Sequence, residues 1–199
     1  VTLAEIFTPF LGYLIAPGFF VDNIKFSLAV EFTRITFPFL LFVSLSSFFS
    51  GILNSNNKFA AAAAAPIILN IILITSILVS YFQNLNIAKH LSYGVTLAGI
   101  IQLLFLIYFT YKFYRPNLKL SFKISSKVKF FFKKLLPSIF SSGVTQINIL
   151  VGTIIASFQS GAVSYLYYAD RVYQINLAIA GIAVGTVSLP VLSKAFKSK

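Results

Sequence analysis

The sequence predicts an all-α fold, a bundle of helices that crosses a membrane several times. Of its 199 residues, 58% are hydrophobic and only 10% are charged, whereas an average soluble domain has about 25% charged residues. The apolar residues also lie in long blocks, close to the roughly 20 residues that a helix needs to cross the hydrocarbon core. A soluble domain of this size could not cover its surface with so few charges.

Six apolar segments follow one another along the chain, five long enough for a full span and the first only part of one. They run from Leu3 to Phe20, Phe32 to Leu53, Ala60 to Phe82, Tyr93 to Phe113, Leu135 to Phe158 and Ser164 to Leu192. Pro9 and Pro17 interrupt the first segment, while Pro38 lies early in the second, where a helix tolerates proline. The third opens with six alanines, which favour helix and allow close packing of membrane helices. The sixth is long enough to tilt.

The basic residues predict the orientation. Sixteen Lys and Arg face four Asp and Glu, a net charge of +12, and most of them follow the second, fourth and sixth segments. Because Lys and Arg near span ends favour the cytoplasm, we expect these loops there. The basic stretch Lys112–Lys134 could instead bind nucleic acid or anionic lipid heads. Since it is short and flanked by spans, the orientation signal and contact with membrane lipids are favoured over nucleic acid.

Composition excludes several kinds of chemistry. The chain has no Cys, one His and four acidic residues, so disulfides and thiolate metal sites are absent and zinc hydrolysis is disfavoured. Neither a glycine-rich phosphate loop nor paired carboxylates at a useful spacing occur. We therefore predict no enzyme, cofactor or metal. The chain also has no Met, even at position 1, and we expect an internal piece of a longer protein.

The clearest candidate site lies in the last segment, where Asp170 and Arg171 fall within an apolar helix. Ionisable residues at membrane depth usually face a wet cavity or a partner. Neighbours in sequence point about 100° apart on a helix, so these two cannot fully neutralise each other. Gln174 shares the Arg171 face and Tyr167 lies one turn earlier. This face suits phosphate or carboxylate recognition, and the alternative is an ion pair with another helix.

Two further sets of polar residues could line a cavity. Thr145 and Asn148 share a face of the fifth segment with Ser142, although hydrogen bonds between helices would explain them equally well. Arg34 could pair with Glu31 at i, i+3 or line a cavity entrance. The single His90 is expected in an outer loop, in contact with solvent.

Several stretches resemble the MurJ/MviN family of lipid II flippases, in the MOP exporter superfamily. The strongest is Gly-Ala-Val-Ser-Tyr-Leu-Tyr-Tyr-Ala-Asp-Arg at 161–171, followed by Gly-Ile-Ala-Val-Gly-Thr at 181–186. Others are Ile-Thr-Phe-Pro-Phe-Leu-Leu at 35–41, Gly-Ile-Leu-Asn-Ser at 51–55, Pro-Ile-Ile-Leu-Asn at 66–70 and Gln-Ile-Asn at 146–148. The likeness runs nearly end to end.

The resemblance implies two lobes of helices around a central cavity, with this chain similar to the end of the third helix through the eighth. Residues 1–113 would end the N-terminal lobe, 114–134 would form a basic cytoplasmic loop between lobes, and 135–199 would begin the C-terminal lobe. It also implies transport of undecaprenyl-pyrophosphate-linked peptidoglycan precursor, lipid II, across the bacterial inner membrane by alternating access.

For the site, the resemblance implies that Arg171 is the cavity arginine of the eighth helix, with Asp170 beside it. The chain departs from the family where Gln174 replaces a frequent Glu, and where Gly152 replaces an Asp that some members use for cation binding. Acid-dependent gating and cation coupling are therefore not carried over. Two alternatives stay open: a related exporter of polysaccharide-linked lipids or drug-like cations, and a non-transporting scaffold that recruits partners through its basic loop.

Overall fold

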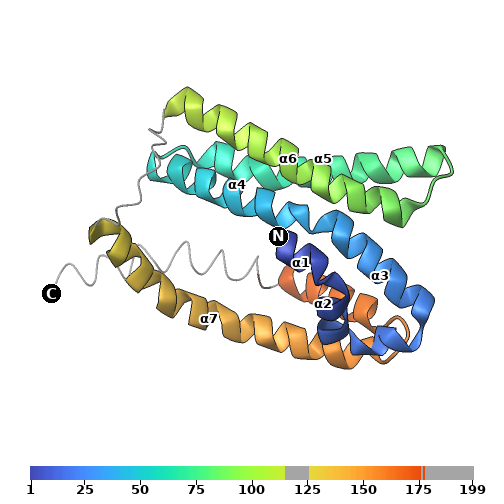
Figure 1. Ribbon diagram of the computed structural model, residues 1–199. Helices are drawn as coiled ribbons and strands as arrows, with labels where there is room; N and C mark the ends of the chain where they lie inside the picture. Colours follow the sequence, from blue (N-terminus) through green and yellow to red (C-terminus); the bar gives the residue numbers. More distant parts are fainter. Residues whose placement is uncertain (115–125, 176, 178–199) are drawn as a thin grey trace.

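The computed structural model describes residues 1–114, 126–175 and 177, and this part of the chain is helical (Figure 1). The predicted all-α class is confirmed. The elements are α1 (Thr2–Ile6), α2 (Thr8–Ile15), the 3-10 helix η1 (Pro17–Val21), α3 (Asn23–Thr36), α4 (Pro38–Ser55), α5 (Phe59–Phe82), α6 (Ile87–Phe113) and α7 (Ser126–Ser157), and residues 162–175 form a further helical segment.

Proline and capping residues explain where these helices begin. Pro9, Pro17 and Pro38 each lie in the first turn of their helix, where the missing N–H is not needed. Asp22 caps α3 by accepting from the backbone N–H groups of Ile24 and Lys25.

The start of α6 corrects one expectation. Asn86 caps this helix by accepting from the N–H of Lys89 at 3.0 Å, so α6 begins six residues before the predicted start at Tyr93. His90 consequently lies in its first turn and is half-buried, rather than in a solvated loop.

Within the described part of the chain, three helices are long and apolar enough to cross a membrane: Asn23–Ser55, in which α3 and α4 follow one another, Phe59–Phe82 and Ile87–Phe113. In α7 the stretch Gly143–Ser157 is apolar but shorter. Most of the predicted sixth span, residues 178–192, lies outside the described residues. Several membrane-spanning helices are therefore present, and their full number stays a prediction.

Helices α4, α5 and α6 lie side by side (Figure 1) around a small core. Phe49 and Leu53 of α4, Ala61 and Ala65 of α5, and Leu106 of α6 form its buried centre. A side-chain carbon at Gly99 of α6 would lie 2.8 Å from the Phe39 ring. Because Ala61 and Ala65 are buried in this core, the predicted use of the alanine run for close helix packing is confirmed.

Helix α7 takes a different course and meets the rest of the chain mainly at one end, against η1 and α2 (Figure 1). There the backbone N–H of Gly18 donates to Ser157 Oγ at 2.9 Å, and the Ser157 hydroxyl donates to the carbonyl of Ile154 at 2.7 Å. Any side chain at Gly18 would overlap the Ser157 backbone. We call this contact the corner.

Candidate functional site

The polar residues of the last predicted span lie on a helix that folds back along α7. After Ser157 the chain turns through Gly161, whose φ of +75° is a left-handed conformation that glycine adopts without a steric penalty. The segment 162–175 then runs beside the end of α7. A side-chain carbon at Gly152 would lie 3.6 Å from Leu166 Cδ2, which shows how closely the two helices approach.

Arg171 is held on one face of this segment by its own helical neighbours. Its Nη2 donates to Tyr167 Oη at 2.9 Å and its Nη1 to Gln174 Oε1 at 3.4 Å. The guanidinium carbon also lies 4.9 Å from the centre of the Tyr167 ring, within range of a cation–π interaction. The predicted face of Arg171, Gln174 and Tyr167 is therefore formed.

Gln174 joins the two ionisable residues that are adjacent in sequence. Its Nε2 donates to Asp170 Oδ2 at 2.6 Å while its Oε1 accepts from Arg171. The expectation that Asp170 and Arg171 each need another partner is met by one residue. A carboxamide can donate to one neighbour through its nitrogen and accept from the other through its oxygen. The i, i+4 spacing to Asp170 is the signal in the sequence that could have revealed this link.

All four of these side chains are exposed in the described structure, so Arg171 can still bind a ligand. Two N–H donors of the guanidinium are used within the helix, and a guanidinium has five. Its positive charge is permanent, and Asp170 is separated from it by the Gln174 amide. Chemically, this arrangement presents an oriented cation beside a phenol and an amide, which suits phosphate or carboxylate oxygens.

Thr145 and Asn148 lie on α7 and are also exposed. Both precede Gly152, which faces Leu166 of the following helical segment. A cavity of about 570 Å³ lies between the two helices and is lined by Gly152, Leu166 and Ala169 among others. Arg171 does not line it.

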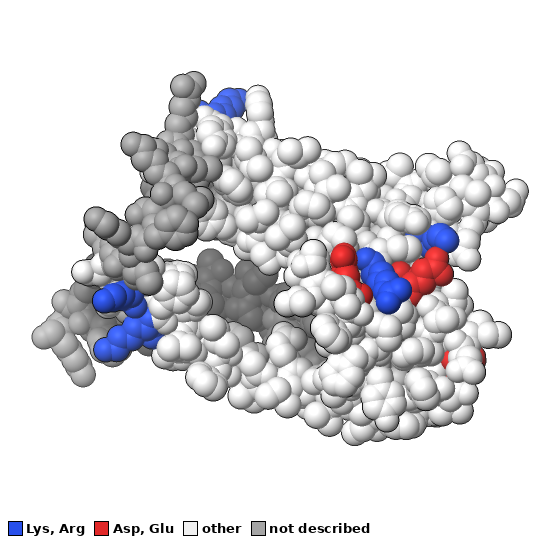
Figure 2. Space-filling model, in the orientation of Figure 1, with Lys and Arg blue, Asp and Glu red and all other residues white. Residues whose placement is uncertain are grey.

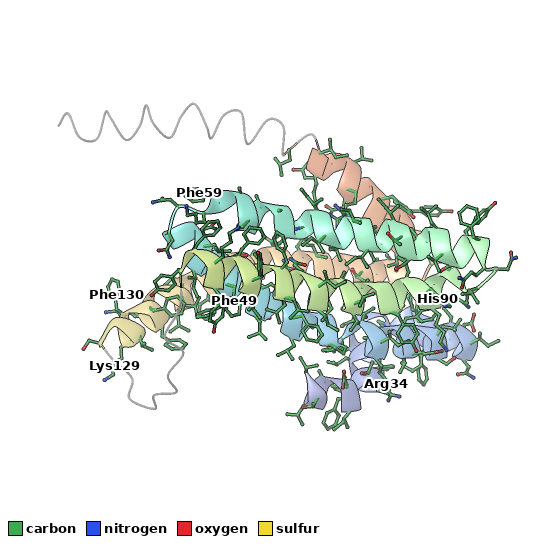
Figure 3. All side chains as sticks on the ribbon, turned by 90° about the horizontal axis from the view of Figure 1, so that it is seen from above. Arg34, Phe49, Phe59, His90, Lys129 and Phe130 are labelled. Atoms are coloured by element: carbon green, nitrogen blue, oxygen red, sulfur yellow. The ribbon has the colours of Figure 1, made fainter. Side chains whose placement is uncertain are left out.

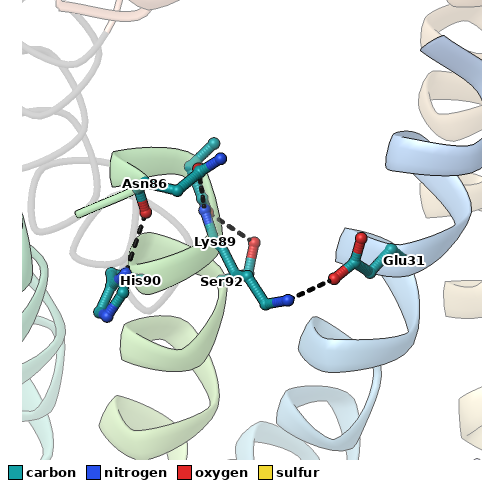
Figure 4. Close-up of polar contacts among 6 residues, drawn as sticks. Glu31, Asn86, Lys89, His90 and Ser92 are labelled. Atoms are coloured by element: carbon teal, nitrogen blue, oxygen red, sulfur yellow. Dashed lines mark hydrogen bonds and ion pairs between the residues drawn. The ribbon is translucent and has the colours of Figure 1, made fainter. Parts of the chain in front are cut away.

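Arg34 does not join this group. It lies in α3 and borders a cavity formed with α5 and α6 and another formed with α1, and none of the cavities it borders includes a residue of the 126–177 part. The suggested pairing of Arg34 with Glu31 is also wrong. Glu31 Oε1 instead lies 2.8 Å from Lys89 Nζ of α6 (Figure 4), a partner 58 residues away that spacing along one helix could not reveal.

The basic residues near the ends of the helices agree with the predicted arrangement of loops. Lys58, between α4 and α5, places its Nζ 4.7 Å from the ring of Phe113 at the end of α6, so the two loops lie at one end of the bundle. In Figure 3, Phe59 lies toward this end, and Arg34 and His90 lie toward the other. Among the residues that the structure describes, no group of three His, Cys, Asp or Glu could hold a metal ion.

These features define a multi-pass helical membrane protein that presents an oriented arginine on a helix packed against its neighbour. The profile of one transporter family, described as "Lipid II flippase MurJ", matches residues 1–199. The chain belongs to the MurJ family.

Three relatives agree with this assignment. Proteins named "Probable lipid II flippase MurJ" from Rhizobium meliloti and Rickettsia prowazekii are each 40% identical to it, over 97% and 100% of the chain. "Lipid II flippase MurJ" from Burkholderia cenocepacia is 35% identical over 92% of the chain. The matched regions are 37%, 39% and 36% of these relatives' lengths. Family membership and the apolar helices place the chain in the bacterial inner membrane as a multi-pass protein.

Proposed function

We propose that this chain serves in the translocation of lipid II, the undecaprenyl-pyrophosphate-linked peptidoglycan precursor, across the inner membrane. The protein would act as a transporter and not as an enzyme. The observation that carries the proposal is the family match over all 199 residues, together with an Arg171 side chain that is oriented but still exposed.

In this proposal Arg171 binds the pyrophosphate. Tyr167 and Gln174 hold its side chain in one orientation before the substrate arrives, which reduces the conformational entropy lost on binding. Gln174 also keeps Asp170 turned toward its own amide, 2.6 Å away, so that the carboxylate does not compete for the guanidinium. Thr145 and Asn148, which are exposed on α7, would bind the polar head. Arg34 would have a different role, because it borders separate cavities.

The arrangement of α7 supports transport by alternating access. At the corner, η1 and α2 contact α7, while toward its N-terminal end α7 lies apart from α4–α6 (Figure 1). Lys58 and Lys112 lie at this second end of the bundle, which the basic loops predict to be cytoplasmic. We expect the contact at the corner to rearrange during transport.

The proposal also includes the finer organisation of the chain. It contains five full spans and part of a sixth, with residues 1–113 ending one lobe and 135–199 beginning the second lobe. Residues 114–134 form the basic connection between the lobes, and from Ser126 onward this connection is the start of α7. Lipid II and the surrounding membrane lipids are its partners. The 32 residues of α7 support the fifth span, because a helix of that length exceeds the hydrocarbon thickness.

Substitution of Arg171 tests the function directly. The gene that carries this sequence, with its flanking coding sequence, would be expressed in a strain depleted of its own flippase. We expect Arg171→Ala to abolish growth and Arg171→Lys to retain part of it, since Lys keeps the charge but loses the planar donors. Normal growth of the alanine variant at ordinary expression would contradict the proposal.

Two further variants accompany the test, a control at Lys25 and a second test at Gln174. Lys25→Ala removes a half-buried cation from α3, where it lies over the Phe19 ring at 4.2 Å, and should leave growth unchanged. Gln174→Leu removes the amide that links Asp170 and Arg171, so we expect reduced growth. Equal membrane levels of all variants, measured by immunoblot, are required for the comparison.

A further inference from the structure

A cavity at the outer end of the bundle is not used by the proposed transport site. It has a volume of about 760 Å³ and lies between the α3–α4 junction, α5 and α6. We call it the junction cavity. Its walls are mainly apolar and include Ile72, Leu97 and Ile100, while Arg34 and His90 also border it.

The break between α3 and α4 creates this space. Pro38 lacks the N–H that would continue the helix, and the Thr96 hydroxyl of α6 donates to the carbonyl of Ile35 just before the break. Before the break, α3 packs against α6. After the break, α4 packs against both α5 and α6. The space between α3 and α5 is therefore left open. One wall of the cavity is formed where α5 and α6 are in close contact, since a side chain at Gly94 of α6 would overlap Ser76 of α5.

The charges beside the cavity are not all neutralised by one another. Glu31 and Lys89 form an ion pair at 2.8 Å (Figure 4). Among the described residues, Arg34 and Glu5 have no ion-pair or side-chain hydrogen-bond partner, although both border a second hollow, which α1 and α3 form. In Figure 2, acidic and basic side chains gather in one cluster, and the other charged side chains of this face lie apart from it. An unpaired cation and an unpaired carboxylate thus lie across one hollow.

This combination matches the chemistry of one kind of ligand. Thr96 of α6 bonds to Ile35, so Arg34 lies about two turns inside the outer end of α6. A long basic side chain can extend from such a depth to the level of the lipid phosphates. The apolar cavity extends from Arg34 toward the bilayer interior, as an acyl chain does. A cation binds a phosphate, and a carboxylate binds an ammonium group. The two charges together favour a zwitterionic head over a purely anionic one.

We propose that the junction cavity and the adjoining hollow bind a zwitterionic phospholipid that carries a primary ammonium group. An acyl chain occupies the junction cavity, the phosphate binds Arg34 and the ammonium group binds Glu5. The cavity volume lies in the range of pockets that hold one small ligand, which suits one acyl chain and not a long polyprenyl tail. The site is separate from Arg171 and does not depend on the transported substrate.

Native mass spectrometry of the purified protein tests this site. The protein would be incubated with equal amounts of phosphatidylethanolamine and phosphatidylglycerol of identical acyl chains, and the retained lipid would be counted. We expect wild type to retain phosphatidylethanolamine in preference. Arg34→Gln should weaken retention of both lipids about tenfold, since a hydrogen bond to a charged group contributes about that factor.

Two other variants separate the head group from the acyl chain. Glu5→Gln should remove the preference for phosphatidylethanolamine while retaining both lipids, and this ratio does not depend on the fraction of protein that is folded. Thr75→Phe should fill the cavity and exclude both lipids. The Thr75 hydroxyl bonds only to Ile71 of its own helix, at 2.7 Å, so no contact between helices is lost.

Lys25→Gln is the matched control, because Lys25 is a cation at the same end of the bundle that does not border the cavity. It should bind both lipids as wild type does. Equal retention by Arg34→Gln and Lys25→Gln would overturn the proposal, as would unchanged retention by Thr75→Phe. Equal retention of the two lipids by wild type would overturn the role of Glu5. Circular dichroism of each variant would confirm that the helices are intact.

Discussion

Helices α4–α6 and the Gly143–Ser157 stretch of α7 are all apolar but are held in the molecule in different ways. The first three share a buried core and pack closely through Ala61, Ala65 and Gly99. In α7, Ser157 is the single buried residue among those whose side chains are described. In lipid, apolar side chains gain little by leaving the solvent, and small residues that allow close approach decide which helices pack together. Hydrophobicity therefore does not distinguish the packed helices from the separate one.

The largest expected effect tests whether the core of α4–α6 is the stable part of the fold. Leu106 is fully buried, whereas Leu104 on the same helix is 59% exposed. We expect Leu106→Ala to lower the free energy of unfolding by about 2–5 kcal/mol, because the deletion leaves a cavity. Leu104→Ala, at a position open to lipid, should change it by far less. Titration with a denaturing detergent in mixed micelles measures both, and similar losses would show that the packed core does not stabilise the bundle.

A smaller effect is expected at the corner. Gly18→Val would force a side chain against the Ser157 backbone, and such overpacking typically costs about 1–3 kcal/mol. The loss should appear as faster hydrogen exchange in η1 and at the end of α7, with α4–α6 unchanged. Gly51→Val is the control, since nothing lies within 4 Å of a side-chain carbon at Gly51. Faster exchange across α4–α6 in Gly18→Val would show that the two regions are not independent.

The smallest effect concerns one hydrogen bond at the same corner. Ser157→Ala removes the acceptor for the Gly18 N–H, and single bonds of this kind in membrane proteins average about 0.6 kcal/mol. We expect faster exchange of the Gly18 amide with little change in global stability. Ser44→Ala is the control, because the Ser44 hydroxyl bonds only to Leu40 of its own helix. Equal exchange at Gly18 in both variants would show that the Ser157 hydroxyl does not hold η1 against α7.

Contacts within one helix could be predicted from the sequence, whereas contacts between helices could not. The face that joins Arg171, Gln174 and Tyr167 follows from helical spacing, and the structure forms it. The Gln174 bond to Asp170 has the same local origin, since it spans four residues of one helix. Glu31 is different, because the spacing to Arg34 was correct for a pair but Lys89 of another helix is nearer. Once Lys89 takes that carboxylate, Arg34 is free beside the junction cavity.

The sequence by itself determined the class of fold, where the long helices end and the membership of a transporter family, whereas α3, α6 and α7 begin six to nine residues before the predicted starts. These depend on local properties: the length of apolar segments, the missing N–H of proline and the spacing of side chains on one helix. Tertiary structure decided that α6 closes on α4 and α5, that α7 meets the bundle at Gly18, and that Glu31 pairs with Lys89. Such choices depend on which helix surfaces fit closely, and residues far apart in sequence determine that fit together.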